Sequence, residues 1–406
     1  MKEITPVNAT LKHKVDDFIV EEIGEKWACK ISKNFQPNKS PNLDNLDIDS
    51  NKDFIACELE KVDLDHFTAI KEIANKLEIP IDWVGYAGTK DKKAHTSQRI
   101  SLFAPLNGSS KYTERCALIK RLENFKSERI FLKNFKWAKR KIKIGYLEEN
   151  HFKIILRNID KKDAIKISNS VRSMNQFANY FGPQRFGSLR KNNVEIGKLI
   201  LKKDWKGAID EILLTTGQYE KEETKLARRK LASDKDYSKA SIYFPRFLRL
   251  EKQILFHLSK NPEDFLGSLK RGDRKNMLMI IHSVQSKIFN DILKRALEEG
   301  LDFTKKGQQN CILVGYKTNF FDGQLGDIEQ EILKNHNLTR EDFDLKEIPH
   351  LRIKGSFRSA VIEIKNLLLT IENDEEFVNS KKIILEFTLP SGVYATTYLD
   401  NFFIFS

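Results

Sequence analysis

The feature that most constrains the fold is a change of periodicity that occurs twice along the chain. Strand-like runs occur near both ends. Between about residues 190 and 350 the apolar residues follow helical spacing instead, as in Val284, Ile288, Ile292 and Ala296. A chain of 406 residues has room for two or three domains. We therefore expect the helical stretch to be a separate module.

The local patterns predict individual elements at several places. Strands are expected at residues 18–22 and 54–59, and Asp65 can cap a helix that follows. Alternating apolar residues within 141–157 predict a hairpin. At the end of the chain, two apolar runs at 384–389 and 394–399 flank a Pro-Ser-Gly turn, so a second hairpin is expected there.

The charge balance favours a polyanionic partner without proving one. Lys and Arg number 70 against 57 Asp and Glu, which gives a formal charge of +13. Opposite charges are interleaved along most of the chain, so an excess that merely aids solubility is an equally good interpretation. The four cysteines lie far apart, and no run resembles a signal peptide or a membrane span. These features predict a cytoplasmic protein that does not enter a membrane.

A glycine-containing turn holds the first candidate for chemistry. Asp91 lies among the four cations Lys90, Lys92, Lys93 and Arg99. On this pattern alone, a solvated turn is the more common interpretation. The alternative is that the cations keep the carboxylate ionised and also hold phosphates, which would place a nucleophile or base beside an RNA backbone.

Two further segments could line a nucleic-acid site. Asn150 and Phe152 are two residues apart on a predicted strand, so they share a face and could hold a flipped base; a core Phe beside a turn Asn is the plainer alternative. The segment 179–187 combines three aromatic residues with Arg185, which could face phosphate or belong to a rigid hinge. A basic run at 225–230 is a secondary candidate for binding tRNA.

Several classes of site lack their motifs. The eight histidines do not pair at metal-ligand spacing, and no C-x-x-C is present, so no metal is predicted. Neither of the glycine-rich nucleotide-binding motifs occurs near Asp91, which argues against a dinucleotide or ATP cofactor and against a methyltransferase.

Four segments, taken in order, resemble the TruD family of tRNA pseudouridine synthases. They are AGTKDKKAHTSQ, KRKIKIGYLEENHF, NYFGPQRFG and LPSGVYAT. The resemblance implies an α+β protein whose catalytic domain has a mixed, mainly antiparallel sheet and is interrupted by an inserted α/β TRUD domain. The corresponding boundaries are 1–187 and 351–406 for the catalytic domain and 188–350 for the insertion. It also implies a monomeric isomerase that acts on the uridine at position 13 of tRNA and needs no cofactor.

The resemblance also assigns roles to single residues. It makes Asp91 the catalytic aspartate, Lys12 a basic residue that pairs with it, and Phe152 the ring that stacks in the active site. Asn150 matches the asparagine two positions before that ring. This chain has Glu149 where the family usually has glycine, and an acid beside a polyanion would need a neighbouring cation or an outward orientation.

The required chemistry agrees with this set of residues. Forming pseudouridine breaks the C1′–N1 bond and joins C1′ to C5 with no net redox change, so an ionised carboxylate and a base pocket suffice. Whether Asp91 attacks C1′ or removes the 2′ proton stays open. The alternative function is a tRNA-binding or folding protein that uses the same basic surface without chemistry.

Overall fold

The computed structural model describes residues 4–44, 46–47, 51–105, 109–187, 189–305 and 309–405. The chain divides into two compact units: unit 1 is Met1–Phe177 with Ile362–Ser406, and unit 2 is Ala178–Val361. The chain passes between them in β9 (Gln176–Ala178) and β12 (Val361–Glu363). The predicted boundaries at 187/188 and 350/351 remain predictions.

Unit 1 is built on one large sheet. Within the described residues it has 11 strands, and its main order is β13-β14-β8-β2-β6-β4-β7. The strands of this path are β2 (Phe18–Gly24), β4 (Phe54–Val62), β6 (His95–Phe103), β7 (Ile130–Ala138), β8 (Glu149–Ile159), β13 (Lys365–Asn373) and β14 (Lys381–Pro390). All neighbours on this path are antiparallel except β2 and β6, which are parallel. The predicted α+β class with a mixed, mainly antiparallel sheet is confirmed.

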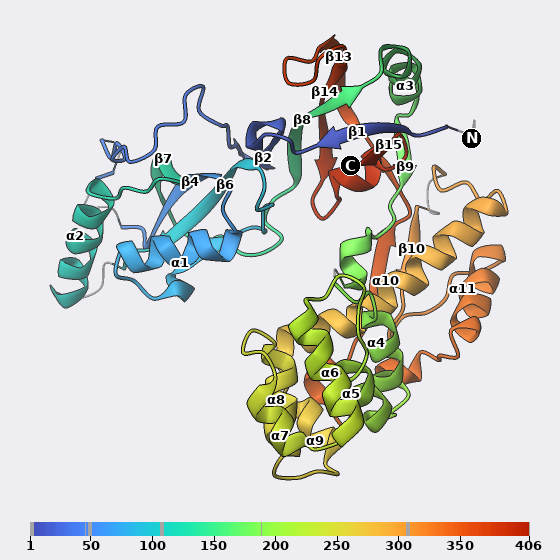
Figure 1. Cartoon of the computed structure of the whole chain (residues 1–406). Coiled ribbons are helices and arrows are strands. Elements are labelled where there is room, and N and C mark those ends of the chain that lie inside the picture. Colours follow the sequence, from blue (N-terminus) through green and yellow to red (C-terminus); the bar gives the residue numbers. More distant parts are fainter. Residues whose placement is uncertain are drawn as a thin grey trace. The chain divides into compact units, whose positions relative to one another are not determined.

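Shorter strands extend this sheet. They are β1 (Val7–Leu11), β3 (Trp27–Ala28), β5 (Val84–Tyr86) and β15 (Phe403–Phe405). The helices of unit 1 are α1 (His66–Lys76), α2 (Ser109–Glu123), α3 (Lys161–Ser173) and α12 (Ala395–Leu399), with short 3-10 turns η1 (Val15–Asp17) and η2 (Ile81–Trp83). Figure 1 shows α1 lying along one face of β4 and β6, where its Ile70 and Ile73 join a core with Leu59 and Ile100. We call this the α1 face.

The predicted helix after Asp65 is confirmed in detail. The Asp65 side chain accepts a hydrogen bond from the amide of Thr68 at 3.0 Å, so it caps α1. The buried residues of the helix include Ile70 and Ile73, three apart on the side that meets the sheet. The cap and the apolar stripe together explain why the helix begins where the sequence predicted.

Both predicted hairpins are wrong in part. Residues 139–148 contain no strand: Ile144 is exposed and Gly145 has a φ of +92°. The strand β8 begins only at Glu149, and it pairs with β2, β14 and β1, which are distant in sequence. The run 394–399 forms helix α12, in which Ala395, Tyr398 and Leu399 are buried at helical spacing. A short apolar run is compatible with either a strand or a buried helix. Here the buried residues are three and four positions apart, which is the spacing of a helix.

Unit 2 is mainly helical and has a two-stranded antiparallel sheet of β10 (Asn310–Leu313) and β11 (Ser356–Ser359). Its helices are α4 (Asn193–Leu201), α5 (Trp205–Leu213), α6 (Glu222–Asp234), α7 (Tyr237–Tyr243), α8 (Arg249–Leu258), α9 (Phe265–Arg271), α10 (Arg274–Glu298) and α11 (Gln324–Asn335), with 3-10 turns η3 (Pro183–Phe186), η4 (Glu341–Phe343) and η5 (Pro349–Leu351). The longest, α10, buries Val284, Ile288 and Ile292 in the core of the unit. No helix of the described chain combines the length and apolar character that a membrane crossing needs.

Candidate active site

Asp91 lies in a turn that crosses the α1 face between β5 and β6. We call residues 87–94 the Asp91 turn. Two glycines, one just before this turn and one within it, lie very close to the 139–148 loop. A Cβ atom at Gly85 would lie 2.5 Å from the carbonyl oxygen of Ile142, and one at Gly88 would lie 2.9 Å from the Leu147 side chain. Neither glycine has a positive φ among the residues described. A glycine is therefore needed at position 85, where the backbone of the 139–148 loop leaves no room for a Cβ, whereas at position 88 the close atom belongs to the flexible Leu147 side chain.

The predicted partner of Asp91 is in place. Lys12 Nζ lies 3.1 Å from Asp91 Oδ2, and the Asp91 side chain is 51% exposed. The same ammonium lies 3.9 Å from the centre of the Phe18 ring. Lys12 has a φ of 58°, an uncommon conformation for a residue with a side chain. The structure thus brings together a basic and an acidic residue from segments far apart in sequence, with the carboxylate open to solvent.

Two of the four predicted cations are turned inward. Lys90 is buried, and its Nζ lies 2.5 Å from Oε2 of the buried Glu22. Burial raises the pKa of Glu22 although Lys90 opposes this effect. Arg99 is also buried and its guanidinium lies 5.3 Å from the Trp27 ring. Only Lys92 and Lys93 of this group are exposed, so they are the two that can meet a phosphate.

Asn150 and Phe152 lie side by side on the α1 face of β8, as predicted. Asn150 pairs with Glu22 of β2, and Phe152 with Val20. The Phe152 ring is 6% exposed; it stacks on Phe387 with centroids 5.5 Å apart. Most of that ring is therefore core, and a base could use only its remaining surface.

One atom of this pair has no hydrogen-bond partner among the described residues. Asn150 Oδ1 is buried and accepts no hydrogen bond from the described residues. Such a group costs about 1–3 kcal/mol when it stays unsatisfied. Buried unsatisfied groups in native proteins call for an explanation, and a ligand that donates a hydrogen bond is one.

The extra acid before Asn150 is neutralised. Glu149 Oε1 lies 2.6 Å from Lys365 Nζ of β13, and the Lys365 side chain is 53% exposed. Lys365 is thus the neighbouring cation that an acid at position 149 was expected to need. Glu149 therefore does not present an uncompensated charge beside the site.

Arg185 lies in unit 2, in η3. Its Nε donates a hydrogen bond to Ser286 Oγ of α10 at 3.1 Å, and its guanidinium lies 5.5 Å from the Phe181 ring. These contacts anchor the side chain within its own unit. A role for Arg185 at a phosphate stays a prediction.

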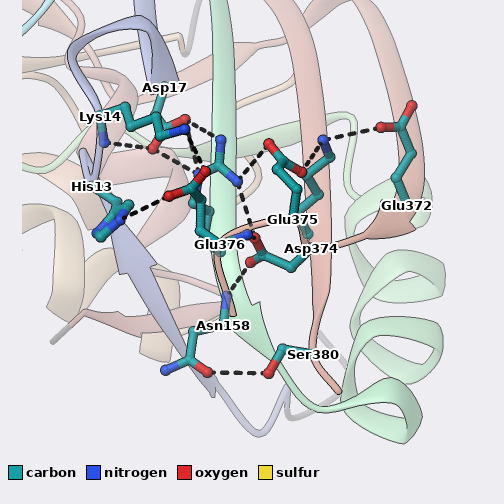
Figure 2. Close-up of polar contacts among 11 residues, drawn as sticks. His13, Lys14, Asp17, Asn158, Glu372, Asp374, Glu375, Glu376 and Ser380 are labelled. Carbon is teal, nitrogen blue, oxygen red and sulfur yellow. Dashed lines mark hydrogen bonds and ion pairs between the residues drawn. The ribbon is translucent and has the colours of Figure 1, made fainter. Parts of the chain in front are cut away.

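The segment that carries Lys12 is held by a cluster that the sequence analysis missed. Figure 2 shows Asp17, Asp374 and Glu375 gathered at one place. Their common partner is Arg157 of β8, which is 2% exposed and lies 2.8 Å from Asp17, 3.0 Å from Asp374 and 3.0 Å from Glu375. The hydrogen bonds that Arg157 donates to Asp17 are the main reason why the pKa of Arg157 is raised. The sequence held one signal for this cluster, because Arg157 is a charged residue at a buried position of a strand.

The same cluster continues toward Lys12. Glu376 forms an ion pair with Lys14, and its carboxylate lies 3.7 Å from His13 Nε2 (Figure 2). The segment 13–17 is therefore tied to the β13–β14 turn at several points. The residue that precedes it, Lys12, is held at a defined place by these contacts.

A second buried network lies on the opposite face of the sheet. Glu60 has a side chain with 0% exposure, and it accepts hydrogen bonds from Ser32, Lys133 and His95, the last at 2.8 Å. Burial would raise the pKa of Glu60, but these hydrogen bonds together lower it to about 2. His95 also contacts Asp16 at 2.9 Å, so the network connects the start of β6 to the segment that carries Lys12.

The described residues contain no group of three or more His, Cys, Asp or Glu side chains arranged to hold a metal ion. The groups that the structure describes in and near the Asp91 turn include the Asp91 carboxylate, the Lys12 ammonium and the Asn150 amide.

Comparison with known proteins identifies relatives along the whole chain. The family model for tRNA pseudouridine synthase D (TruD) matches residues 1–312 and 304–402. A protein of Methanopyrus kandleri is 31% identical over 350 residues, which cover 84% of this chain and 83% of the relative. One from Methanocaldococcus jannaschii is 29% identical and covers 97% and 94% of the two chains. They carry the names probable tRNA pseudouridine synthase D and probable tRNA pseudouridine synthase D 1.

A solved structure is also similar. It carries the name putative tRNA pseudouridine synthase D (TruD) and comes from Methanosarcina mazei, with a TM-score of 0.75 and 26% identity. The match covers 98% of this chain and 94% of that one.

Proposed function

Because this chain belongs to the TruD family of tRNA pseudouridine synthases, we propose that it isomerises the uridine at position 13 of tRNA with Asp91 as the catalytic carboxylate. The protein is an isomerase that forms pseudouridine in tRNA. The observation that carries the assignment of Asp91 is its exposed carboxylate 3.1 Å from the Lys12 ammonium.

The reaction is an internal rearrangement of one nucleotide. The C1′–N1 bond breaks, the uracil turns, and a C1′–C5 bond forms; C5 then loses its hydrogen and N1 gains one. Atoms and electrons balance without an oxidant, a reductant or a donor group, so the chemistry requires no cofactor. The target nucleotide must leave the stack, because its sugar and base edge are out of reach within a paired stem.

Asp91 supplies the ionised carboxylate that this rearrangement needs. It can attack C1′ to form a covalent intermediate or remove the 2′ proton to form a glycal. Lys12 orients the carboxylate in either case, because its ammonium binds Oδ2 directly. The pair is thus prepared before the substrate arrives, which reduces the reorganisation that the reaction requires.

Asn150 and Phe152 supply the base pocket in this proposal. The buried Oδ1 of Asn150 accepts a hydrogen bond from an N–H of the uracil, which satisfies an atom that the described residues leave unpaired. The exposed part of the Phe152 ring contacts the base while it turns. Lys92, Lys93 and, on unit 2, Arg185 are the groups proposed to meet phosphates.

The test uses two tRNA transcripts that differ only at position 13, one with uridine and one with cytidine. We expect a single pseudouridine at position 13 of the first transcript and none in the second. Product elsewhere would discard the position, and no product in either would favour a tRNA-binding protein without chemistry.

We also propose that the protein acts as a monomer in the cytoplasm. Its four cysteines are free thiols, which suits a reducing compartment. Sedimentation at the concentrations used for turnover should give the mass of one chain; a stable dimer would contradict this.

A further inference from the structure

A buried lysine lies directly beneath Asp91. Lys61, near the end of β4, is 0% exposed, although the other inward residues of this strand, such as Cys57 and Leu59, are apolar. An ammonium is rarely buried without a specific partner, because its desolvation costs several kcal/mol, on the order of the stability of a whole domain. Lys61 therefore calls for a structural reason.

Its partners are two backbone carbonyl groups. Lys61 Nζ donates to the carbonyl oxygen of Asp91 at 2.6 Å and to that of Leu64 at 2.8 Å. The first bond connects β4 to the Asp91 turn across 30 positions of sequence. Lys61 thus fixes the backbone of Asp91 itself, while the Asp91 side chain stays open to solvent.

Neighbouring strands hold the rest of the Asp91 turn. Glu22 of β2 binds the side chain of Lys90, and Gln98 of β6 donates to the carbonyl oxygen of Gly88 at 3.1 Å. The strand register places these residues and Lys61 on the same face, since Thr96 lies opposite both Val20 and Lys61. Three adjacent strands therefore hold the Asp91 turn in place, and Lys61 is the residue that binds the backbone of Asp91 itself.

We propose that Lys61 is a positioning residue for Asp91, which sets the direction of the carboxylate by holding its backbone carbonyl and does not touch the substrate. The inference rests on the proposed function, in which Asp91 is catalytic. Full burial keeps Lys61 from any RNA atom, so its effect on turnover can act only through the turn.

The charges around Lys61 give this role a pH dependence. Burial, with a smaller contribution from Lys90, lowers the pKa of Lys61 to about 8, although Asp91, Asp65 and Asp63 oppose the change. His66 of α1 also interacts with the charge of Lys61; burial lowers the pKa of His66 to about 4, so it is neutral where Lys61 titrates. Above pH 8 the amine loses its charge, and its hydrogen bond to the Asp91 carbonyl weakens.

The test compares Lys61→Met with Lys133→Met. Methionine has nearly the length of lysine and suits an apolar site, whereas Lys133 lies on the opposite face of the sheet and binds Glu60. We expect Lys61→Met to lower kcat by about 100-fold, as small misplacements of a reacting group do, and to leave the KM for tRNA unchanged. Lys133→Met should keep the wild-type kcat.

The pH profile of kcat separates positioning from general damage to the fold. In the wild type and in Lys133→Met, kcat should fall as the pH rises through about 8, the pKa of Lys61; Lys61→Met should lack this fall. If Lys61→Met does not fold, the profile of the other two proteins decides: a flat one between pH 7 and 9 overturns the proposal. Wild-type kcat in a folded Lys61→Met also overturns it.

The same set of measurements keeps the two proposals apart. Turnover retained by Asp91→Asn would refute the proposed function, whatever Lys61 does. An inactive Asp91→Asn beside a fully active Lys61→Met would refute only the positioning role.

Discussion

Lys12 Nζ lies 3.1 Å from Asp91 Oδ2, although 79 positions separate the two residues in the sequence. Neither residue is held by its immediate neighbours alone. The segment after Lys12 is bound through Asp17 to Arg157, and the backbone of Asp91 is bound to Lys61. The distance between these two side chains therefore depends on contacts with several strands of the sheet in unit 1.

Replacing Asp91 with asparagine should abolish isomerisation, because an amide can neither attack C1′ nor take up a proton. Affinity for tRNA should stay within a few-fold, since one exposed carboxylate contributes nothing favourable toward phosphates. Single-turnover assays and filter binding on the same tRNA measure both quantities. Asp82→Asn, a matched change at an exposed residue of η2, is the control and should remain active.

Asn150→Leu should separate stability from activity. The change removes a buried oxygen that has no partner, so the free energy of unfolding should stay the same or rise by about 1 kcal/mol. Pseudouridine formation should fall, because the uracil loses an acceptor. Urea denaturation and turnover are the measurements. Lower stability with full activity would instead make Asn150 an ordinary structural residue.

Glu60 should make unit 1 sensitive to acid. Its pKa is about 2 in the folded protein, below the value of 4.5 for a free side chain. A lowered pKa gives stability that is present above pH 4.5 and is lost as the pH falls toward 2; for a shift of this size it is about 3 kcal/mol at most. The dependence of the unfolding free energy on pH should be shallower in this range for Glu60→Gln. Glu123→Gln, at an exposed site of α2, should keep the wild-type slope.

Arg157→Met should destabilise the protein by about 3–5 kcal/mol, because it leaves the buried carboxylates of Asp17 and Asp374 without their cation. Chemical denaturation measures the loss. Arg172→Met, at an exposed position of α3, is the matched control and should change stability by less than about 0.5 kcal/mol. Equal stabilities of the two variants would show that the cluster is not a structural anchor.

The sequence predicted features that depend on local physics. The cap at Asp65, the strand at residues 18–22 and the long helix containing Val284 follow from neighbouring residues, and the structure has all three. The hairpin at 141–157 was wrong because alternation alone does not name a partner strand; β8 pairs with β2 and β14 instead. Pairing partners distant in sequence carry no local signal.

Some residues of the candidate site could likewise be predicted from the sequence, and others could not. Lys12, Asp91, Asn150 and Phe152 lay in segments that resemble a family, whereas Lys61 and Arg157 did not stand out. Both are cations at buried positions of strands rich in apolar residues, FIACELEKV and ENHFKIILRNI. That contrast was visible in the sequence, but the carbonyl and carboxylate groups that justify it come from segments far away.

The position of β8 in the sheet has a consequence for how the protein is made. One neighbour, β2, is synthesised before β8, but the other, β14, leaves the ribosome only after all of unit 2. Until then the edge of β8 that carries Asn150 and Phe152 has unpaired backbone groups, and the Phe152 ring lacks Phe387. A nascent chain that has not yet made β14 therefore lacks part of its candidate active site and has an unpaired strand edge that favours aggregation.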